Sequence, residues 1–194
     1  MVVSTSLCGQ FATILRDGRA KTPAFCFAGE LIKAALDHGA KKIILAVGGS
    51  ACTDAGAGAL QALGAKLRDT QGREIAHGGA ALQECHEIDL SLLDPRIAGV
   101  EFILASDVTN PLLGIHGAAH VYSPQKGASA ADVELLEQAL THFSAIAGSA
   151  HINTPGAGAA GGFGYMALTF LNAQARSGIE MVLDLVNFEQ HLTG

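Results

Sequence analysis

The residues best suited to chemistry follow apolar segments of the chain. The first group comes directly after the apolar run at residues 43–47 and is rich in glycine. Its candidate ligand-binding residues are Gly48, Gly49, Ser50, Asp54, Gly56 and Gly58. Backbone N–H groups in a glycine turn and at a helix start can converge on one anion, and glycine allows a bulky ligand to come close. The pattern favours binding of a phosphate or a carboxylate; a strand-to-helix turn that binds nothing is the alternative.

A second apolar run, at residues 100–105, is followed by Asp107 and Asn110. In open α/β sheets, ligands bind beyond the carboxyl ends of the strands. We therefore expect Asp107, Asn110 and Asp54 to converge on one site. The alternative is that Asp107 and Asn110 form local side-chain turns before Pro111.

Two later loops add candidates. In the loop at residues 121–127, Lys126 could neutralise a phosphate as a point charge, although a lone lysine is more often solvated. The loop at residues 155–162 matches G-x-G-x-x-G at Gly156, Gly158 and Gly161. Residues 149–154 do not form a convincing strand before it, so the pattern argues against a dinucleotide fingerprint. The loop could still direct N–H groups at an anion.

Composition narrows the class of protein. The chain has 194 residues, 49% hydrophobic and 15% charged, which is typical of a folded globular protein. Its net charge of -6 and the lack of a basic cluster argue against nucleic-acid binding. The four cysteines form no C-x-x-C pair, so we expect reduced thiols and a cytoplasmic protein; a nucleophilic Cys52 is a weaker alternative. No segment reaches the length of a membrane span.

The elements that must position these loops alternate between helices and strands. Apolar spacing predicts helices at residues 28–38, 55–63, 162–175 and 179–186, and Ser129-x-x-Asp132 predicts the start of a further, long helix. The apolar runs at 43–47 and 100–105 predict buried strands, and residues 65–75 predict a β-hairpin. In the last helix we expect Ile179, Val182, Leu183 and Val186 to face inward. The order indicates an α/β fold, a mixed sheet with flanking helices.

Taken together, these loops resemble the bacterial glycerate kinases. The motifs that carry the resemblance are Val47-Gly48-Gly49-Ser50-Ala51 with Asp54 and Gly56-Ala57-Gly58, then Gln61-Ala62-Leu63-Gly64-Ala65, Leu93-Asp94-Pro95-Arg96, Asp107-Val108-Thr109-Asn110-Pro111-Leu112, Ser123-Pro124-Gln125-Lys126-Gly127-Ala128, Pro155 to Gly162 and Gly178-Ile179-Glu180. They occur in the family's order and spacing, over about Gly29 to Leu192.

The resemblance implies a kinase that transfers a phosphoryl group from ATP to glycerate with Mg²⁺. It implies a two-domain fold with the site in the cleft, of which this chain is similar to the middle domain. We expect Asp107 to act on the substrate hydroxyl or to bind Mg²⁺, Asn110 to orient the ligand and Lys126 to bind phosphate. The implied nucleotide- and substrate-binding residues are Gly48, Gly49, Ser50, Asp54, Gly56, Gly58, Gln125, Gly156, Gly158 and Gly161.

The chain departs from the family pattern at both ends. Residues 1–28 do not match the family's opening and are expected to form a divergent N-terminal segment, with residues 29–194 as the glycerate-kinase-like domain. The alternative to an active kinase is therefore a truncated, inactive remnant, or a domain that folds alone and associates. We expect a homo-oligomer or a missing complementary domain as partner, and an unusually apolar face turned towards it.

Overall fold

The structure, a computed structural model, describes residues 1–4 and 24–186. The strands are β1 (Val2–Ser4), β2 (Lys42–Ala46), β3 (Lys66–Arg68), β4 (Glu87–Asp89), β5 (Glu101–Ala105) and β6 (Gln174–Arg176). The α-helices are α2 (Ala24–Asp37), α3 (Ala57–Ala62), α4 (Ala118–Tyr122), α5 (Ala130–Ala147), α6 (Ala159–Phe170) and α7 (Gly178–Leu185). Three 3₁₀ helices are η1 (Gly79–Glu84), η2 (Pro95–Gly99) and η3 (Pro124–Lys126).

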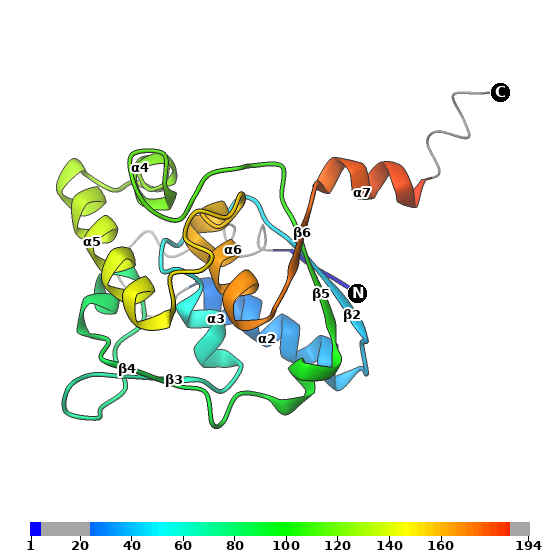
Figure 1. The fold of residues 1–194 in the computed structure, drawn as a ribbon, viewed down its shortest axis with the longest axis horizontal. Coiled ribbons are helices and arrows are strands. Elements are labelled where there is room, and N and C mark those ends of the chain that lie inside the picture. Colours follow the sequence, from blue (N-terminus) through cyan, green and yellow to red (C-terminus); the bar gives the residue numbers. More distant parts are fainter. Residues whose placement is uncertain (5–23, 187–194) are drawn as a thin grey trace.

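The main sheet has four parallel strands in the order β1-β2-β5-β6. The two apolar runs of the sequence form its central pair, with Ile44 beside Ile103 in the register. Figure 1 shows the sheet on one side of the molecule, with α2, α3 and α6 beside it and α4 and α5 farther away. The predicted α/β fold is confirmed, and the antiparallel pairing occurs in a separate ribbon of β3 and β4.

The core lies between the sheet and these helices. Ile43 and Leu45 of β2 and Phe102 and Leu104 of β5 are almost fully buried, as expected for strands that are apolar throughout. Phe163 of α6 is also fully buried and belongs to the same cluster. One continuous core therefore holds the carboxyl ends of β2 and β5 in fixed relative positions.

The β-ribbon differs in part from the predicted hairpin. Arg68 does bridge Glu74 across the turn that follows β3, but the regular partner of β3 is β4, at Glu87–Asp89. A strand of three residues is too short for its alternation to stand out in the sequence. The segment after residue 89 is a turn leading to η2.

The C-terminal part of the described chain holds two corrections. The helix predicted at 162–175 ends at Phe170, because Asn172 adopts a left-handed conformation (φ 50°) and the chain then forms β6. The helix predicted at 179–186 is present as α7, but its apolar side does not face inward: Ile179 is 56% exposed, and Val182 and Val186 are each 52% exposed. Figure 1 shows why, since α7 extends away from the body beyond β6.

Candidate functional site

The loops that follow β2, β5 and β6 meet at one edge of the sheet. The strands are parallel, so their carboxyl ends lie together. Backbone hydrogen bonds continue past the strand ends, from Val47 N to Ala105 O and from Ser106 N to Arg176 O. Figure 1 shows the segments that follow β2, β5 and β6 leaving the sheet on the same side. This is the edge at which the sequence predicted a site.

Asp54 lies beneath the first glycine loop and is fully buried. Its carboxylate accepts hydrogen bonds from Gly56 N at 2.9 Å and from Gly58 N at 3.2 Å. Burial raises the pKa of Asp54 to about 6, opposed by these backbone bonds and by Lys126. Two N–H groups at the start of α3, where the sequence pattern favoured a bound anion, donate to the side chain of Asp54.

Lys126 forms hydrogen bonds with three residues of the same loop. Its Nζ donates to Cys52 O at 2.6 Å, to Ser50 Oγ at 3.2 Å and to Thr53 Oγ1 at 3.3 Å. An ammonium group has three donors, so these three acceptors satisfy it. Burial lowers the pKa of Lys126 to about 8, although Asp54 favours the charged form. In this arrangement the ammonium braces the loop.

The second glycine loop packs directly on the first. Gly161 O accepts a hydrogen bond from Ala55 N, and a Cβ at Gly161 would overlap Cys52 O. Gly158 N donates to Asn110 O, and a Cβ there would overlap Pro111 O. These glycines allow two backbones to approach closely, so their amide groups face protein atoms.

Two further glycines of the loops lie next to neighbouring segments, Gly56 tightly and Gly156 at ordinary contact distance. A Cβ at Gly56 would lie 2.6 Å from Met166 Cβ, so this glycine lets α6 approach the first loop. A Cβ at Gly156 would lie 3.6 Å from Ser106 Oγ, which places the second loop next to the end of β5. The two glycine loops and the segment after β5 therefore form one contiguous region.

Asp107 joins the end of β5 to the start of α7. Its Oδ1 accepts from Ser177 Oγ at 2.9 Å and from Ile179 N at 3.2 Å. These hydrogen bonds lower the pKa of Asp107, so the carboxylate is ionised at neutral pH while it remains exposed to solvent. It is an anionic group at the sheet edge that a ligand or cation can reach.

Asn110 is held through both ends of its amide. Nδ2 donates to His116 O at 2.8 Å, and Oδ1 accepts from Tyr122 OH at 2.6 Å. Gly48, Gly49 and Gln125 are exposed near the same loops, and Ser50 is half-buried. The structure thus brings Lys126 and Asp54 together around the first glycine loop. Asp107 instead binds the start of α7, and Asn110 binds His116 and Tyr122 beside α4.

Sequence reasoning missed several residues of this region. Thr53 and Ser123 are buried and share a hydrogen bond of 3.0 Å beneath the loop, and neither was predicted as a site residue. Ser177 had a usable signal, because Ser177-x-x-Glu180 is a helix-start pattern and Ser177 does cap α7. Tyr122, the partner of Asn110, carried no signal.

A Mg²⁺ ion fits Asp107 in one respect. Mg²⁺ is commonly held by one or two carboxylates together with substrate phosphates and waters, and Asp107 is an ionised, exposed carboxylate. Within residues 1–4 and 24–186, no group of three or more His, Cys, Asp or Glu side chains could hold a metal alone.

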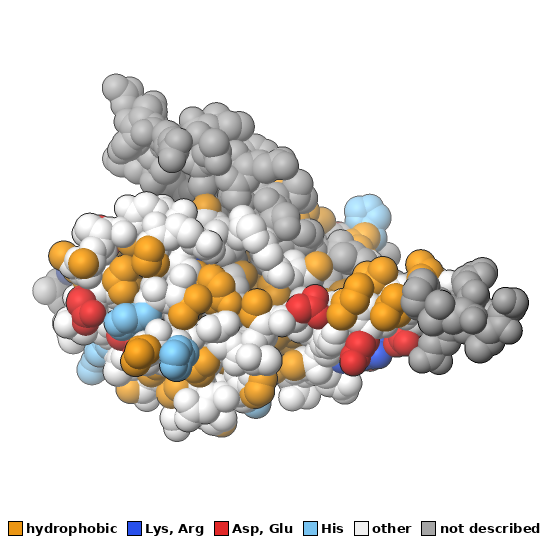
Figure 2. Space-filling model, turned by 90° about the horizontal axis from the view of Figure 1, so that it is seen from above, with side chains coloured by type: hydrophobic (Ala, Val, Ile, Leu, Met, Phe, Trp, Pro, Cys, Tyr) orange, Lys and Arg blue, Asp and Glu red, His pale blue; other side chains and the backbone are white. Residues whose placement is uncertain are grey.

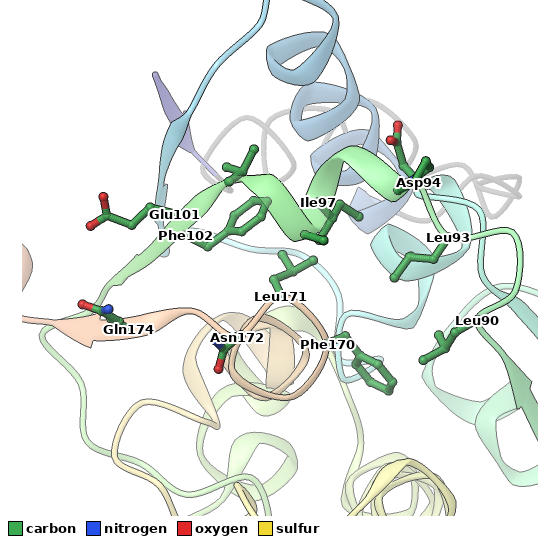
Figure 3. Close-up of a pocket in the computed structure, with 13 residues that line it drawn as sticks. Leu90, Leu93, Asp94, Ile97, Glu101, Phe102, Phe170, Leu171, Asn172 and Gln174 are labelled. Carbon is green, nitrogen blue, oxygen red and sulfur yellow. The ribbon is translucent and has the colours of Figure 1, made fainter.

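A pocket of about 520 Å³ lies at the other end of the sheet (Figure 3). It is lined by Phe102 near the start of β5, by Gln174 at the start of β6, and by Phe170 and Leu171 at the end of α6. Its position at the amino ends of the strands separates it from Asp107 and Lys126.

No helix in the described ranges is long and apolar enough to cross a membrane.

Comparison with known proteins agrees with this arrangement. The model of the glycerate kinase family matches residues 19–194. The chain is 48% identical over 168 residues to glycerate 2-kinase of Escherichia coli, and 50% identical over 165 residues to glycerate kinase of Bacillus subtilis. These alignments cover 84% and 83% of this chain but 44% and 43% of the relatives.

The structural comparison covers similar shares of this chain and of the matched protein. A crystal structure of a protein described as glycerate kinase 2, from Salmonella typhimurium LT2, matches with a TM-score of 0.78 at 47% identity. It covers 84% of this chain and 44% of that protein, so the chain spans less than half the length of the relatives it matches. The family model spans strands β2, β5 and β6 of the main sheet and both glycine loops, and the chain belongs to the glycerate kinase family.

Proposed function

We propose that this chain supplies one wall of a site that phosphorylates glycerate with ATP and Mg²⁺. The observation that carries the proposal is the ionised, exposed Asp107 at the carboxyl edge of a glycerate-kinase-family sheet. Phosphoryl transfer depends mainly on positioning and on stabilising charge. The loops at this edge offer a fixed carboxylate, a fixed amide and exposed glycine backbone.

Asp107 and Asn110 would act directly on the ligands. Asp107 either accepts the proton of the glycerate hydroxyl or holds Mg²⁺, since both roles require an ionised carboxylate. Asn110 orients the bound ligand through its amide. When bound with the nucleotide, Mg²⁺ would neutralise charge on the phosphate oxygens.

In this proposal, some residues of the glycine loops contact the ligand and others hold the loops in their conformation. Gly48, Gly49, Ser50 and Gln125 would contact the ligand, and their incomplete burial supports this role. Asp54, Gly56, Gly58, Gly158 and Gly161 are buried within the loops and would support them. Gly156 joins the second loop to the end of β5. Lys126 braces the first loop and would raise the local positive potential for phosphate through the loop.

Replacing Asp107 by asparagine is expected to lower kcat for ATP-dependent glycerate phosphorylation about 100-fold or more, because a neutral amide neither accepts the proton nor holds Mg²⁺ well. The assay measures ADP formation with D-glycerate, and phosphorus NMR identifies the phosphorylated hydroxyl. The matched control is Asp132→Asn. Asp132 is a solvent-exposed carboxylate that also accepts from a serine hydroxyl, here Ser129 at the start of α5.

Equal activity losses in Asp107→Asn and Asp132→Asn would show that Asp107 acts only as a helix cap. A wild-type protein that folds but converts no ATP in the presence of D-glycerate would favour the second candidate, an inactive remnant or associating domain. That candidate is supported by the length of the match, which is 44% of the Escherichia coli relative.

The exposed side of α7 favours association in either case. Ile179 and Val182 on this helix and Val186 directly after it form an exposed apolar face, and Figure 2 shows hydrophobic side chains gathered on this part of the molecule. An apolar face of this kind on a folded domain commonly marks an interaction surface. We propose that it is covered by the part of the family fold that this chain does not span; a second copy of the chain is the competing occupant.

Replacing Val182 by aspartate is expected to weaken that association at least about tenfold, because a charge would be buried in an apolar contact. The measurement is titration of this chain with a polypeptide comprising the unmatched portion of the Escherichia coli relative, followed by calorimetry and light scattering. Leu135→Asp on α5 is the matched control, since Leu135 is 39% exposed on another helix. Light scattering that instead shows dimers of this chain, dissociated by Val182→Asp, would assign the face to self-association.

A further inference from the structure

The orientation of the Asn110 amide is decided by its neighbours. His116 O can only accept a hydrogen bond, so the amide nitrogen must face it, and the 2.8 Å contact agrees. The amide oxygen therefore faces Tyr122, and the Tyr122 hydroxyl must donate at 2.6 Å. Each group has one role in this pair of bonds, so reversing the amide would place two oxygens against each other at His116.

Tyr122 is suited to hold this role. It is half-buried at the end of α4, and burial raises its pKa, so its hydroxyl stays protonated at neutral pH and remains a donor. A short hydrogen bond to a part-buried amide restricts two side chains at once. The remaining Nδ2 hydrogen and the remaining lone pair of Asn110 then have a defined direction.

The segment between Asn110 and α4 is itself fixed. Gly114 N donates to Glu137 Oε1 of α5 at 2.6 Å, and Leu112 N donates to Ile152 O at 2.8 Å. Gly117 N closes a turn onto Gly114 O at 2.7 Å. His116 O and Tyr122 OH are therefore held in place relative to one another before any ligand binds.

From this geometry we infer that Tyr122 is a positioning residue, which sets the direction of the Asn110 amide at the ligand-binding edge. The inference rests on the proposed function in so far as Asn110 contacts the ligand. Tyr122 itself acts through Asn110 and has no direct part in the transfer. The expected consequence is an effect on turnover that exceeds any effect on stability.

The test compares Tyr122→Phe with Tyr165→Phe, because the chain has two tyrosines and both donate a 2.6 Å hydrogen bond. Tyr165 donates to Gly148 O at the end of α5, so its variant removes a similar bond outside the Asn110 network. The first readout is the side-chain amide signal of Asn110 in nitrogen-15 NMR spectra, assigned by its loss in Asn110→Ala. We expect Tyr122→Phe to shift and broaden this signal, and Tyr165→Phe to leave it unchanged.

The second readout is steady-state kinetics. We expect Tyr122→Phe to lower kcat for glycerate phosphorylation about tenfold with little change in KM for ATP, and Tyr165→Phe to leave kcat within about twofold. An unchanged Asn110 amide signal in Tyr122→Phe would overturn the inference, with or without turnover. An altered signal with unchanged kcat in an active protein would overturn the positioning role alone. Absence of turnover in the wild type contradicts the proposed function, while the NMR comparison still decides whether Tyr122 orients Asn110.

Discussion

Replacing Gly161 by alanine is expected to lower the free energy of unfolding by about 2–5 kcal/mol. Gly161 has φ +69°, a left-handed conformation that costs an alanine about 1–2 kcal/mol. The added Cβ would also overlap Cys52 O and lie 2.9 Å from Lys126 Nζ, and neither the backbone nor the braced ammonium can move away easily. The substitution therefore forces the two glycine loops apart.

Gly72→Ala separates the two causes. Gly72 has φ +76°, and a Cβ there would meet no atom within 4 Å. An alanine at this position therefore carries only the cost of the left-handed backbone conformation and no steric overlap. We expect this control to lose about 1–2 kcal/mol, measured by urea unfolding under the same conditions as Gly161→Ala. Equal losses in the two variants would mean that the loops do not press on each other at Gly161.

The fold could be predicted where its cause is local. The apolar runs that became β2 and β5 are long enough to identify as buried strands. The start of α5 was also predictable, because Ser129 and Asp132 form the reciprocal hydrogen bonds of a capping box. β4 and β6 have only three residues each, and their existence depends on pairing with distant strands.

The candidate site was predictable in location but not in the role of each residue. Glycine permits the close approach of either a ligand or another backbone, and the sequence pattern is the same in both cases. At Gly158 and Gly161 the approaching group is the backbone of another loop. Asp54 illustrates the same limit, since a carboxylate near a helix start can attract a cation or, as here, satisfy the N–H groups itself.

Helix periodicity also could not show what covers α7. The spacing of Ile179, Val182 and Val186 indicates one apolar side, and the structure leaves that side exposed. An apolar side packs against whatever is available, and the sequence does not say whether that is the same domain or a partner. The titration and light-scattering experiment with Val182→Asp tests whether a partner covers this side of α7.

The buried charge of Asp54 gives the second large effect. Relative to Asp54→Asn, the wild-type protein is expected to lose about 2.5 kcal/mol of unfolding free energy as the pH rises from about 4 to about 7. The pKa of Asp54 is raised from 3.8 to about 6, so in this interval the folded state binds a proton that the unfolded state has released. Stability is therefore greatest below the unfolded pKa and decreases as the pH rises through the folded pKa.

Urea unfolding at several pH values, for both proteins, measures this difference. Asp94→Asn is the control with the opposite sign, because the Arg96 side chain lowers the pKa of Asp94 and its contribution is lost as the pH falls below about 4. Parallel pH profiles for wild type and Asp54→Asn would mean that Asp54 ionises in the folded state as it does in the unfolded chain. That result would mean that the hydrogen bonds from Gly58 and Gly56 and the charge of Lys126 fully offset the cost of burying the carboxylate.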